Sequence, residues 1–171
     1  IQDILELKGP KLHAKRKSIR RFREAHEEHT HLTILDASSL DTAKQLVHIF
    51  KDWQGIKNHS RLHIRNEITA FKRLLKYAKK LPVQIFGMYL HNKLSGFIVC
   101  EALPGKYGVM HFGKIATQAT GAFEYLIYKS AELLHAQGCE YLNLQQDLNI
   151  ENLRKTKLSW RPIKFLKKYT V

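Results

Sequence analysis

The spacing of apolar residues predicts a chain that alternates between helices and strands. In four stretches, apolar side chains recur every three or four residues, as they do along the buried face of a helix. A fifth, shorter helix is expected near the end of the chain. The predicted helices cover residues 11–28, the segment from Ser39 or Asp41 to Trp53, and residues 65–80, 119–135 and 150–156.

Six runs of apolar or alternating residues predict strands, which cover residues 32–35, 84–91, 94–102, 107–115, 140–144 and 163–169. Asn92-Lys93 is a two-residue polar turn between the second and third runs, so three consecutive antiparallel strands are expected there. The strand at 140–144 follows a helix and should lie parallel to its neighbour. We therefore expect the α/β (α+β) class, with a mixed central sheet and helices on both faces.

Length and composition favour a single domain over residues 1–171. A chain of 171 residues with 44% hydrophobic side chains is long enough to bury one well-formed core. It starts at Ile1 without a methionine, and we expect it to be part of a longer protein. No run approaches the roughly 18 apolar residues that a membrane-spanning helix needs. Cys100 and Cys139 lie in or beside apolar runs, as buried free thiols of a cytoplasmic domain do.

The net charge of +14 is concentrated at the two ends of the chain. Residues 1–23 hold eight Lys/Arg against two acids, and residues 154–171 hold seven Lys/Arg and no acid. Like charges repel, so this clustering favours an anionic partner: tRNA or another nucleic acid, an anionic lipid surface, or a phosphate-bearing cofactor. The alternative is a solvated basic face that keeps the protein soluble. The candidate polyanion-binding residues are Lys15, Arg16, Lys17, Arg20 and Arg21.

The last third of the sequence carries its most specific motif. Residues 141–148 (YLNLQQDL) and 153–160 (LRKTKLSW) are followed by Pro162 and Lys168-Tyr169. This ending resembles that of the family grouped with the C-terminal domain of phosphatidylglycerol lysyltransferase. Further segments agree in order and spacing, namely Lys8-Gly9, residues 15–17, Glu67, and residues 111–115 ahead of Gly121.

The resemblance covers nearly the whole chain and implies a GNAT-like acyltransferase fold. It also implies that this domain is the second of a tandem pair, with an upstream GNAT domain in the same protein as its partner. The best-known members of the family move an amino acid from aminoacyl-tRNA to a lipid hydroxyl. A cytoplasmic location, including the inner face of a membrane, would follow.

Four positions depart from the family pattern. Gln145 and Gln146 stand where acidic side chains are expected, Asn149 stands where a glycine is expected, and Gly113 stands where a glutamate is expected. The missing carboxylates weaken the case for a carboxylate as the catalytic base.

A turn that binds the phosphates of coenzyme A is expected before the helix at 119–135. Glycines in such a turn let backbone N–H groups approach the pyrophosphate. Residues 118–123 keep Gln118 and Gly121, our candidates for binding substrate there, but Phe123 replaces the last small residue. This departure favours aminoacyl-tRNA over acyl-CoA as donor, although a glycine used only for close packing explains Gly121 equally well.

Acyl transfer passes through a tetrahedral oxyanion, so the site needs a cation or N–H donors and a proton acceptor. Lys114, at the end of a predicted strand, is our first candidate for the cation. His111 is a second catalytic candidate. Alternation along a strand places the two side chains on opposite faces unless a bulge intervenes.

Asp147 follows a predicted parallel strand, at the edge where α/β sheets place ligands. It is a catalytic candidate that orients a substrate amine, with Arg154 and Lys157 as substrate-binding neighbours. A structural salt bridge that holds the last helix is the alternative. Glu67 is a further substrate-binding candidate, although an acid at the start of a helix also complements the helix dipole.

His26, His29 and His31 lack the i, i+4 spacing that places two ligands on one helix face, so no metal site is predicted. The sequence defines no cofactor, and aminoacyl-tRNA and acyl-CoA are the two candidate donors. Two functions stay open. One is a transferase that moves an aminoacyl or acyl group to a lipid, peptide or small molecule. The alternative is a non-catalytic GNAT-fold module that binds nucleic acid or an anionic membrane surface.

Overall fold

A five-stranded sheet forms the centre of the computed structural model, which describes residues 1–56 and 61–166. The strands lie in the order β1 (Thr30–Ile34), β2 (Val83–Leu90), β3 (Lys93–Leu103), β4 (Tyr107–Ile115) and β5 (Tyr141–Asn143). The first four are antiparallel to their neighbours, and β5 is parallel to β4. The predicted mixed sheet and its parallel crossover are confirmed.

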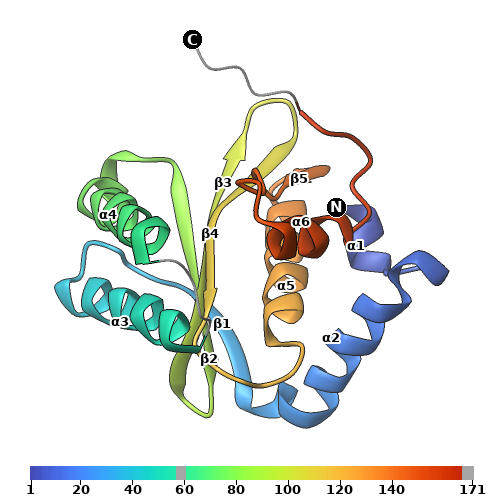
Figure 1. Cartoon of the computed structure of the whole chain (residues 1–171), viewed down its shortest axis with the longest axis horizontal. Helices are drawn as coiled ribbons and strands as arrows, with labels where there is room; N and C mark the ends of the chain where they lie inside the picture. Colours follow the sequence, from blue (N-terminus) through green and yellow to red (C-terminus); the bar gives the residue numbers. More distant parts are fainter. Residues whose placement is uncertain (57–60, 167–171) are drawn as a thin grey trace.

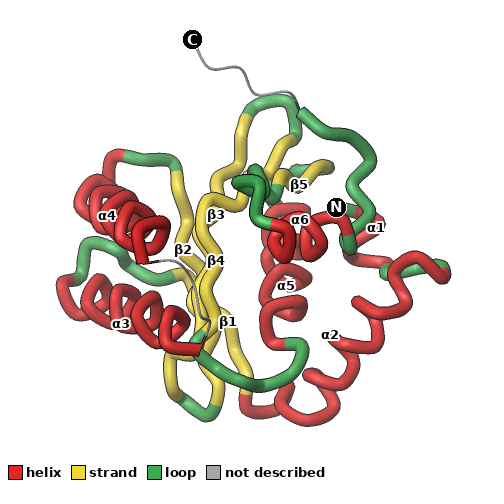
Figure 2. Tube along the Cα trace, viewed as in Figure 1, coloured by secondary structure: helices red, strands yellow, loops and turns green. Residues whose placement is uncertain are grey.

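Helices cover both faces of this sheet, as predicted (Figure 1). On one side lie α3 (Leu40–Ile56) and α4 (Arg61–Tyr77). On the other lie α1 (Gln2–Glu6), α2 (His13–His26), α5 (Ala122–Ala136) and α6 (Glu151–Leu158). Trp160, two residues after α6, packs into the core on this side. Short 3₁₀ turns at Pro10–Leu12, Glu27–His29 and Ala78–Lys80 complete the elements, and Figure 2 shows the loops that join them.

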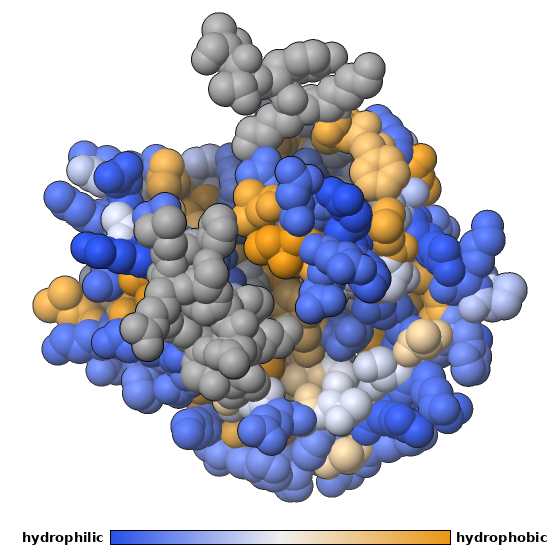
Figure 3. Space-filling view, viewed as in Figure 1, coloured by the Kyte–Doolittle hydropathy of each residue, from blue (hydrophilic) through white to orange (hydrophobic). Residues whose placement is uncertain are grey.

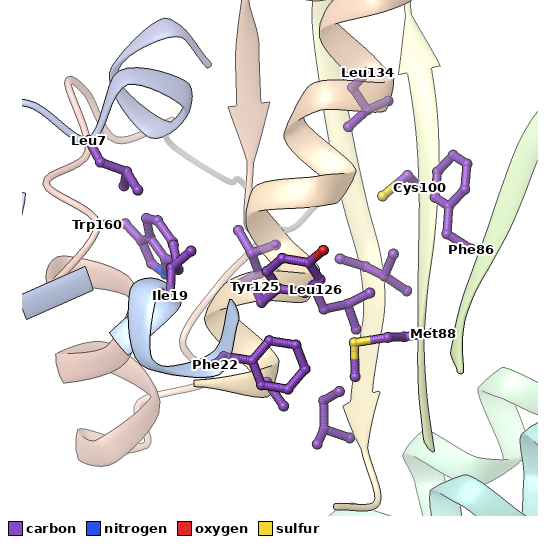
Figure 4. Packing of buried hydrophobic residues seen from close by; sticks show 14 of the residues in the cluster. Leu7, Ile19, Phe22, Phe86, Met88, Cys100, Tyr125, Leu126, Leu134 and Trp160 are labelled. Carbon is purple, nitrogen blue, oxygen red and sulfur yellow. The ribbon is translucent and has the colours of Figure 1, made fainter. Parts of the chain in front are cut away.

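Two hydrophobic cores lie on opposite faces of the sheet because successive strand residues point to opposite sides. Phe22 of α2, Leu126 of α5 and Met88 of β2 point toward one another in the first core (Figure 4). The second core, against α3 and α4, contains Phe50 and Phe97. The middle of β3, residues 96–100, is buried on both sides and is apolar without alternation.

The chain departs from the predicted elements at three places. The β2–β3 turn is His91-Asn92, one residue earlier than predicted; both residues have positive φ, 50° and 61°, which suits a tight hairpin turn. The short helix α1 was not predicted. The predicted strand at 163–169 is wrong for residues 163–166, which follow Arg161 at φ 54° and form no strand. Residues 167–169 lie outside the described residues.

Burial makes both cysteine thiols poor nucleophiles. The side chains of Cys100 and Cys139 are buried in the first core and form no disulfide. Burial raises the pKa of the Cys100 thiol to about 12, and it also raises the pKa of Cys139. The thiolate is the reactive form of cysteine, so neither side chain is available to a disulfide reagent.

We therefore expect both thiols to resist modification in the native protein. Dithionitrobenzoate at pH 8 should leave the peptides carrying Cys100 and Cys139 unmodified, as followed by mass spectrometry, and should modify both in guanidinium chloride. Rapid native modification of either peptide would contradict the packing described above.

Candidate functional site

Strands β4 and β5 pair only briefly and then separate. Their ladder joins Tyr107 to Tyr141, Gly108 to Leu142 and Val109 to Asn143. The strands are parallel, so the residues that follow Val109 and Asn143 leave the ladder at the same end. The carboxyl ends of parallel strands are where open α/β sheets bind ligands. The point where β4 and β5 separate is therefore a candidate ligand-binding site.

A β-bulge interrupts β4 directly after that point. Cys100 of β3 pairs with Met110 and Val99 pairs with Phe112, so His111 is an extra residue with no partner across the ladder. The His111 side chain bonds to Glu101, which shares a face of β3 with Val99 by alternation. That face carries the second core, in which Phe112 also packs. Because of this bulge, the side chains of His111 and Lys114 lie on the same face of β4.

Glu101 and His111 form a paired acid and base at the bulge. The Glu101 Oε2 atom lies 2.8 Å from His111 Nε2, and the two side chains are 18% and 28% exposed. The other ring nitrogen, Nδ1, lies 3.5 Å from Nε2 of Gln145, which follows β5. A carboxylate bound to one imidazole nitrogen orients the ring and leaves the other nitrogen to accept a proton.

Sequence reasoning missed Glu101. A usable signal was present, because Glu101 is the one charged residue of the predicted strand at 94–102. A lone acid in a strand that is otherwise apolar requires a partner. Its partner, His111, could not be identified without the register of β3 and β4.

Lys114 and Glu67, two residues singled out from the sequence, lie together on this face. The Lys114 side chain is almost fully buried, and its Nζ is 2.7 Å from Glu67 Oε1. The same ammonium lies 3.7 Å from the ring centroid of Trp53 and 4.8 Å from that of Phe50. Lys114 is thus an enclosed cation that links β4 to α3 and α4.

Asp147, Arg154 and Lys157 also lie together, around the loop that follows β5. Arg154 Nε is 2.5 Å from Asp147 Oδ2, and Arg154 Nη2 donates to Asn149 Oδ1 at 2.9 Å. Lys157 donates to the backbone carbonyls of Leu144 and Gln146. The hydrogen bond from Arg154 lowers the pKa of Asp147, whereas burial lowers the pKa of Lys157. These three charges therefore hold loop 144–149 to α6.

The turn before α5 is packed from one side by α2. Gly121 has φ 88°, and a Cβ on it would lie 2.3 Å from the backbone oxygen of Ser18. Two N–H groups of this turn already have partners: Ala119 donates to Thr117 Oγ1 and Ala122 donates to the Ala119 carbonyl, both at 3.2 Å. Close packing is therefore a sufficient reason for the glycine. Gln118 is exposed at the start of the turn.

Phe123 and Gly113, two departures noted in the sequence, compensate each other. A Cβ at position 113 would lie 3.2 Å from Cε2 of Phe123. The aromatic ring therefore occupies the space into which a side chain at 113 would extend.

The predicted polyanion-binding residues of α2 divide into two groups. Lys15 is buried, pairs with Glu124 at 3.1 Å, and lies 4.8 Å from the Trp160 ring. Arg16 donates to the carbonyls of Leu7 and Gly9. Lys15 and Arg16 thus fasten α2 to the domain. Arg16 is nevertheless exposed, as are Lys17, Arg20 and Arg21.

A cluster of histidines surrounds the β2–β3 turn. The rings of His29 and His91 are 4.7 Å apart, and that of His26 is 6.3 Å from His91. Within residues 1–56 and 61–166, no group of His, Cys, Asp or Glu side chains is arranged to hold a metal ion. The helices of that same part of the chain are all too short or too polar to cross a membrane.

The fold is that of GNAT acyltransferases. Ribosomal-protein-alanine N-acetyltransferase from Brucella melitensis has a TM-score of 0.59 to this chain at 15% identity, over 83% of this chain and 97% of its own. A protein of unknown function from Bacteroides thetaiotaomicron has a TM-score of 0.79 at 25% identity, over 95% of this chain and 54% of its own.

The chain belongs to the family described as phosphatidylglycerol lysyltransferase, C-terminal, whose model matches residues 1–171. The C-terminal domain of a putative lysylphosphatidylglycerol synthetase from Agrobacterium fabrum has the same fold, with a TM-score of 0.61 at 16% identity, over 92% of this chain and 53% of its own. The chain thus spans about half the length of the Bacteroides and Agrobacterium chains. No curated protein matches it.

The packing at Gly121 predicts a large loss of stability in Gly121→Ala. Alanine at φ 88° costs about 1–2 kcal/mol for the left-handed backbone, and the clash with α2 adds roughly 1–3 kcal/mol. Gly138→Ala is the matched control, because Gly138 has φ 86° and no atom lies within 4 Å of its added Cβ. Urea unfolding should show the larger loss for Gly121→Ala; equal losses would contradict the close approach of α2.

Proposed function

We propose that this chain is a catalytic transferase domain that moves an aminoacyl or acyl group, with His111 as its general base. The observation that carries the proposal is the Glu101–His111 pair at the bulge of β4. It lies beside the point where β4 and β5 separate, and its second ring nitrogen, Nδ1, faces Gln145 of the loop after β5 at 3.5 Å. Family and fold support the transferase class.

In the proposed reaction, His111 Nδ1 takes the proton from the hydroxyl or amine of the acceptor as that group attacks the carbonyl of the donor. Glu101 is a positioning residue: it holds the ring and stabilises the imidazolium. The tetrahedral intermediate collapses, the bond to the leaving group breaks, and the leaving oxygen or sulfur takes the proton back from His111. Lys114 is retained as the candidate cation, acting from the same face of β4.

For the donor we favour aminoacyl-tRNA over acyl-CoA. The turn at Gly121 is packed against α2 and has satisfied two of its N–H groups internally, which leaves fewer donors for a pyrophosphate. Lys17, Arg20 and Arg21 form an exposed basic strip on α2 that suits a nucleic acid backbone. The proposed acceptors are a lipid hydroxyl, a peptide amine or a small molecule. The proposed partner within the protein is an upstream GNAT domain.

Acyl transfer by the protein is the decisive test. The protein is incubated with aminoacyl-tRNA or acetyl-CoA and with lipid or peptide acceptors, and products are identified by their mass shift. We expect transfer from aminoacyl-tRNA. His111→Asn should lower kcat about 100-fold or more, and Glu101→Gln on the order of 10-fold with KM little changed. His48→Asn and Glu151→Gln, on the exposed surface, are matched controls and should retain full activity.

The dependence of rate on pH separates a base from a structural residue. A general base must be unprotonated, so kcat/KM of the unaltered protein should fall at low pH. In His111→Asn that acidic limb should disappear. An unchanged profile with a folded variant would remove His111 from the mechanism. Lys114→Met, assayed in parallel, tests the cation separately.

A folded protein that transfers nothing from either donor would overturn the catalytic proposal. The non-catalytic module that binds nucleic acid or an anionic membrane would then be the better account. Transfer from acetyl-CoA alone would leave the base in place and refute the choice of donor.

A further inference from the structure

A further concentration of positive charge lies in the middle of the chain, on α4 and the 3₁₀ turn that follows it. Residues 65–80 hold six Lys/Arg and one acid. The acid, Glu67, pairs with Lys114 of β4 and neutralises none of the six. All six cations are exposed, and together they form the α4 stripe: Arg65, Lys72, Arg73, Lys76, Lys79 and Lys80.

The α4 stripe occupies the face of the helix that points away from the core. Phe71 and Leu75 of α4 are buried in the second core. Successive residues of an α-helix are rotated by about 100°, so Arg65, Lys72 and Lys76 fall within one narrow sector on the other side. Arg65 and Lys76 are about 16 Å apart along the helix axis. The outer surface of α4 is accordingly hydrophilic in Figure 3.

The cations of the α4 stripe lack the partners that other surface cations have. Elsewhere, Arg20 pairs with Glu24 and Lys155 pairs with Glu151, one helical turn away in each case. Among the described residues, no carboxylate forms an ion pair with any cation of the α4 stripe. Like charges along one helix face repel each other, so the stripe is destabilising until an anionic partner neutralises it.

The α4 stripe lies on the same side of the sheet as the Glu101–His111 pair. Glu67 of α4 contacts Lys114, which follows His111 by three residues on the same face of β4. The other exposed basic strip, on α2, lies across the sheet (Figure 1). The α4 stripe is therefore a basic surface that shares a side of the sheet with the candidate base.

The chemistry of the α4 stripe favours a nucleic acid over a membrane or a protein. A helix that docks on a bilayer inserts an apolar face, and the apolar face of α4 is packed in the second core. Four of the six cations are lysines, which are depleted in protein–protein interfaces. A duplex carries one phosphate charge per roughly 1.7 Å of its axis and can meet every cation of the stripe. Tyr77, 44% exposed and 5.4 Å from Lys76 Nζ, adds an aromatic ring for stacking.

We propose that the α4 stripe is the surface on which the RNA of the donor docks. The body of the RNA lies along α4, and its aminoacylated end reaches His111 from the side of α3 and α4. The identity of the RNA rests on the proposed function, whereas binding to the stripe is tested without any transfer. Phosphate contacts position a nucleic acid without reading its sequence, so the stripe supplies affinity and leaves the choice of amino acid to the site around His111.

Filter binding of uncharged tRNA at several salt concentrations tests the α4 stripe. Lys72→Gln, Arg73→Gln and Lys76→Gln are combined in one protein, the α4 variant. Glutamine is a good helix former, so α4 is retained. At about 100 mM salt the α4 variant should bind tRNA on the order of 10-fold or more weakly, and its slope of log K against log salt should be smaller by about two to three.

A matched control removes the same charge elsewhere. Lys8→Gln, Lys129→Gln and Lys155→Gln are combined, because each of these lysines is already paired with an acid. This control should bind tRNA nearly as well as the unaltered protein. An equal loss in the two variants would mean that net charge alone governs binding, and it would overturn the α4 stripe as a site.

Steady-state kinetics separate docking of the RNA from the reaction. With whole aminoacyl-tRNA, the α4 variant should raise KM about 10-fold and leave kcat unchanged, because it removes binding that is equal in the ground and transition states. With a minimal donor, an aminoacyl ester of the CCA trinucleotide, the α4 variant and the unaltered protein should have the same kcat/KM. A loss of rate with the minimal donor would contradict a docking role.

The inference and the proposed function fail on different results. Transfer from aminoacyl-tRNA by a protein whose α4 variant binds tRNA undiminished would overturn the inference and keep the proposed function. Binding of tRNA through the α4 stripe without transfer from any donor would support the surface and overturn the proposed function. Stronger binding to phosphatidylglycerol vesicles than to tRNA, lost in the α4 variant, would make the stripe a membrane surface and overturn the inference.

Discussion

One extra residue in β4 decides which polar side chains of the domain meet. Side chains alternate along a strand, so one inserted residue moves every later side chain of that strand to the opposite face of the sheet. With His111 unpaired in the ladder, Phe112 and Lys114 lie on the face of α3 and α4, while Gly113 contacts Phe123 of α5. The pairing of His111 with Glu101, the burial of Lys114 and the fit of Phe123 all depend on this single irregularity.

The sequence predicted the layers of the fold better than the site. Periodicities of 3.6 and 2 extend over many residues, so they revealed the main helices and strands to within a few residues. A bulge without a glycine leaves no such pattern, and the pairing of His111 with Glu101 could not be deduced. The same limit applies to α2: its periodicity separates buried from exposed positions, but Lys15 is long enough to turn inward and reach Glu124. Residues 163–166 were predicted as the start of a strand, but they pair with no other strand in the described part of the chain.

The residues that depart from the family pattern fall into two kinds. Asn149 preserves the backbone conformation of its loop, whereas Gly113, Gln145 and Gln146 are uncharged where acids are expected. Asn149 adopts φ 59°, a conformation that asparagine tolerates better than most residues other than glycine, so the loop keeps the form that a glycine there allows. The ring of Phe123 on α5 fills the space beside Gly113 of β4 that a side chain at position 113 would need. Gln145 brings an amide to the His111 ring where the family carries an acid. The loss of carboxylates thus changes the chemistry around the bulge without a change of fold.

The contact of Lys15 with Trp160 joins the beginning of the chain to its end. Contacts between residues far apart in sequence slow folding, because loop-closure entropy opposes them before they are made. On the ribosome, α2 emerges long before Trp160 does. A nascent chain that stops short of Trp160 can already dock α2 on α5 through Lys15–Glu124 and Phe22–Tyr125. It lacks the indole ring that covers the Lys15 ammonium in the folded domain.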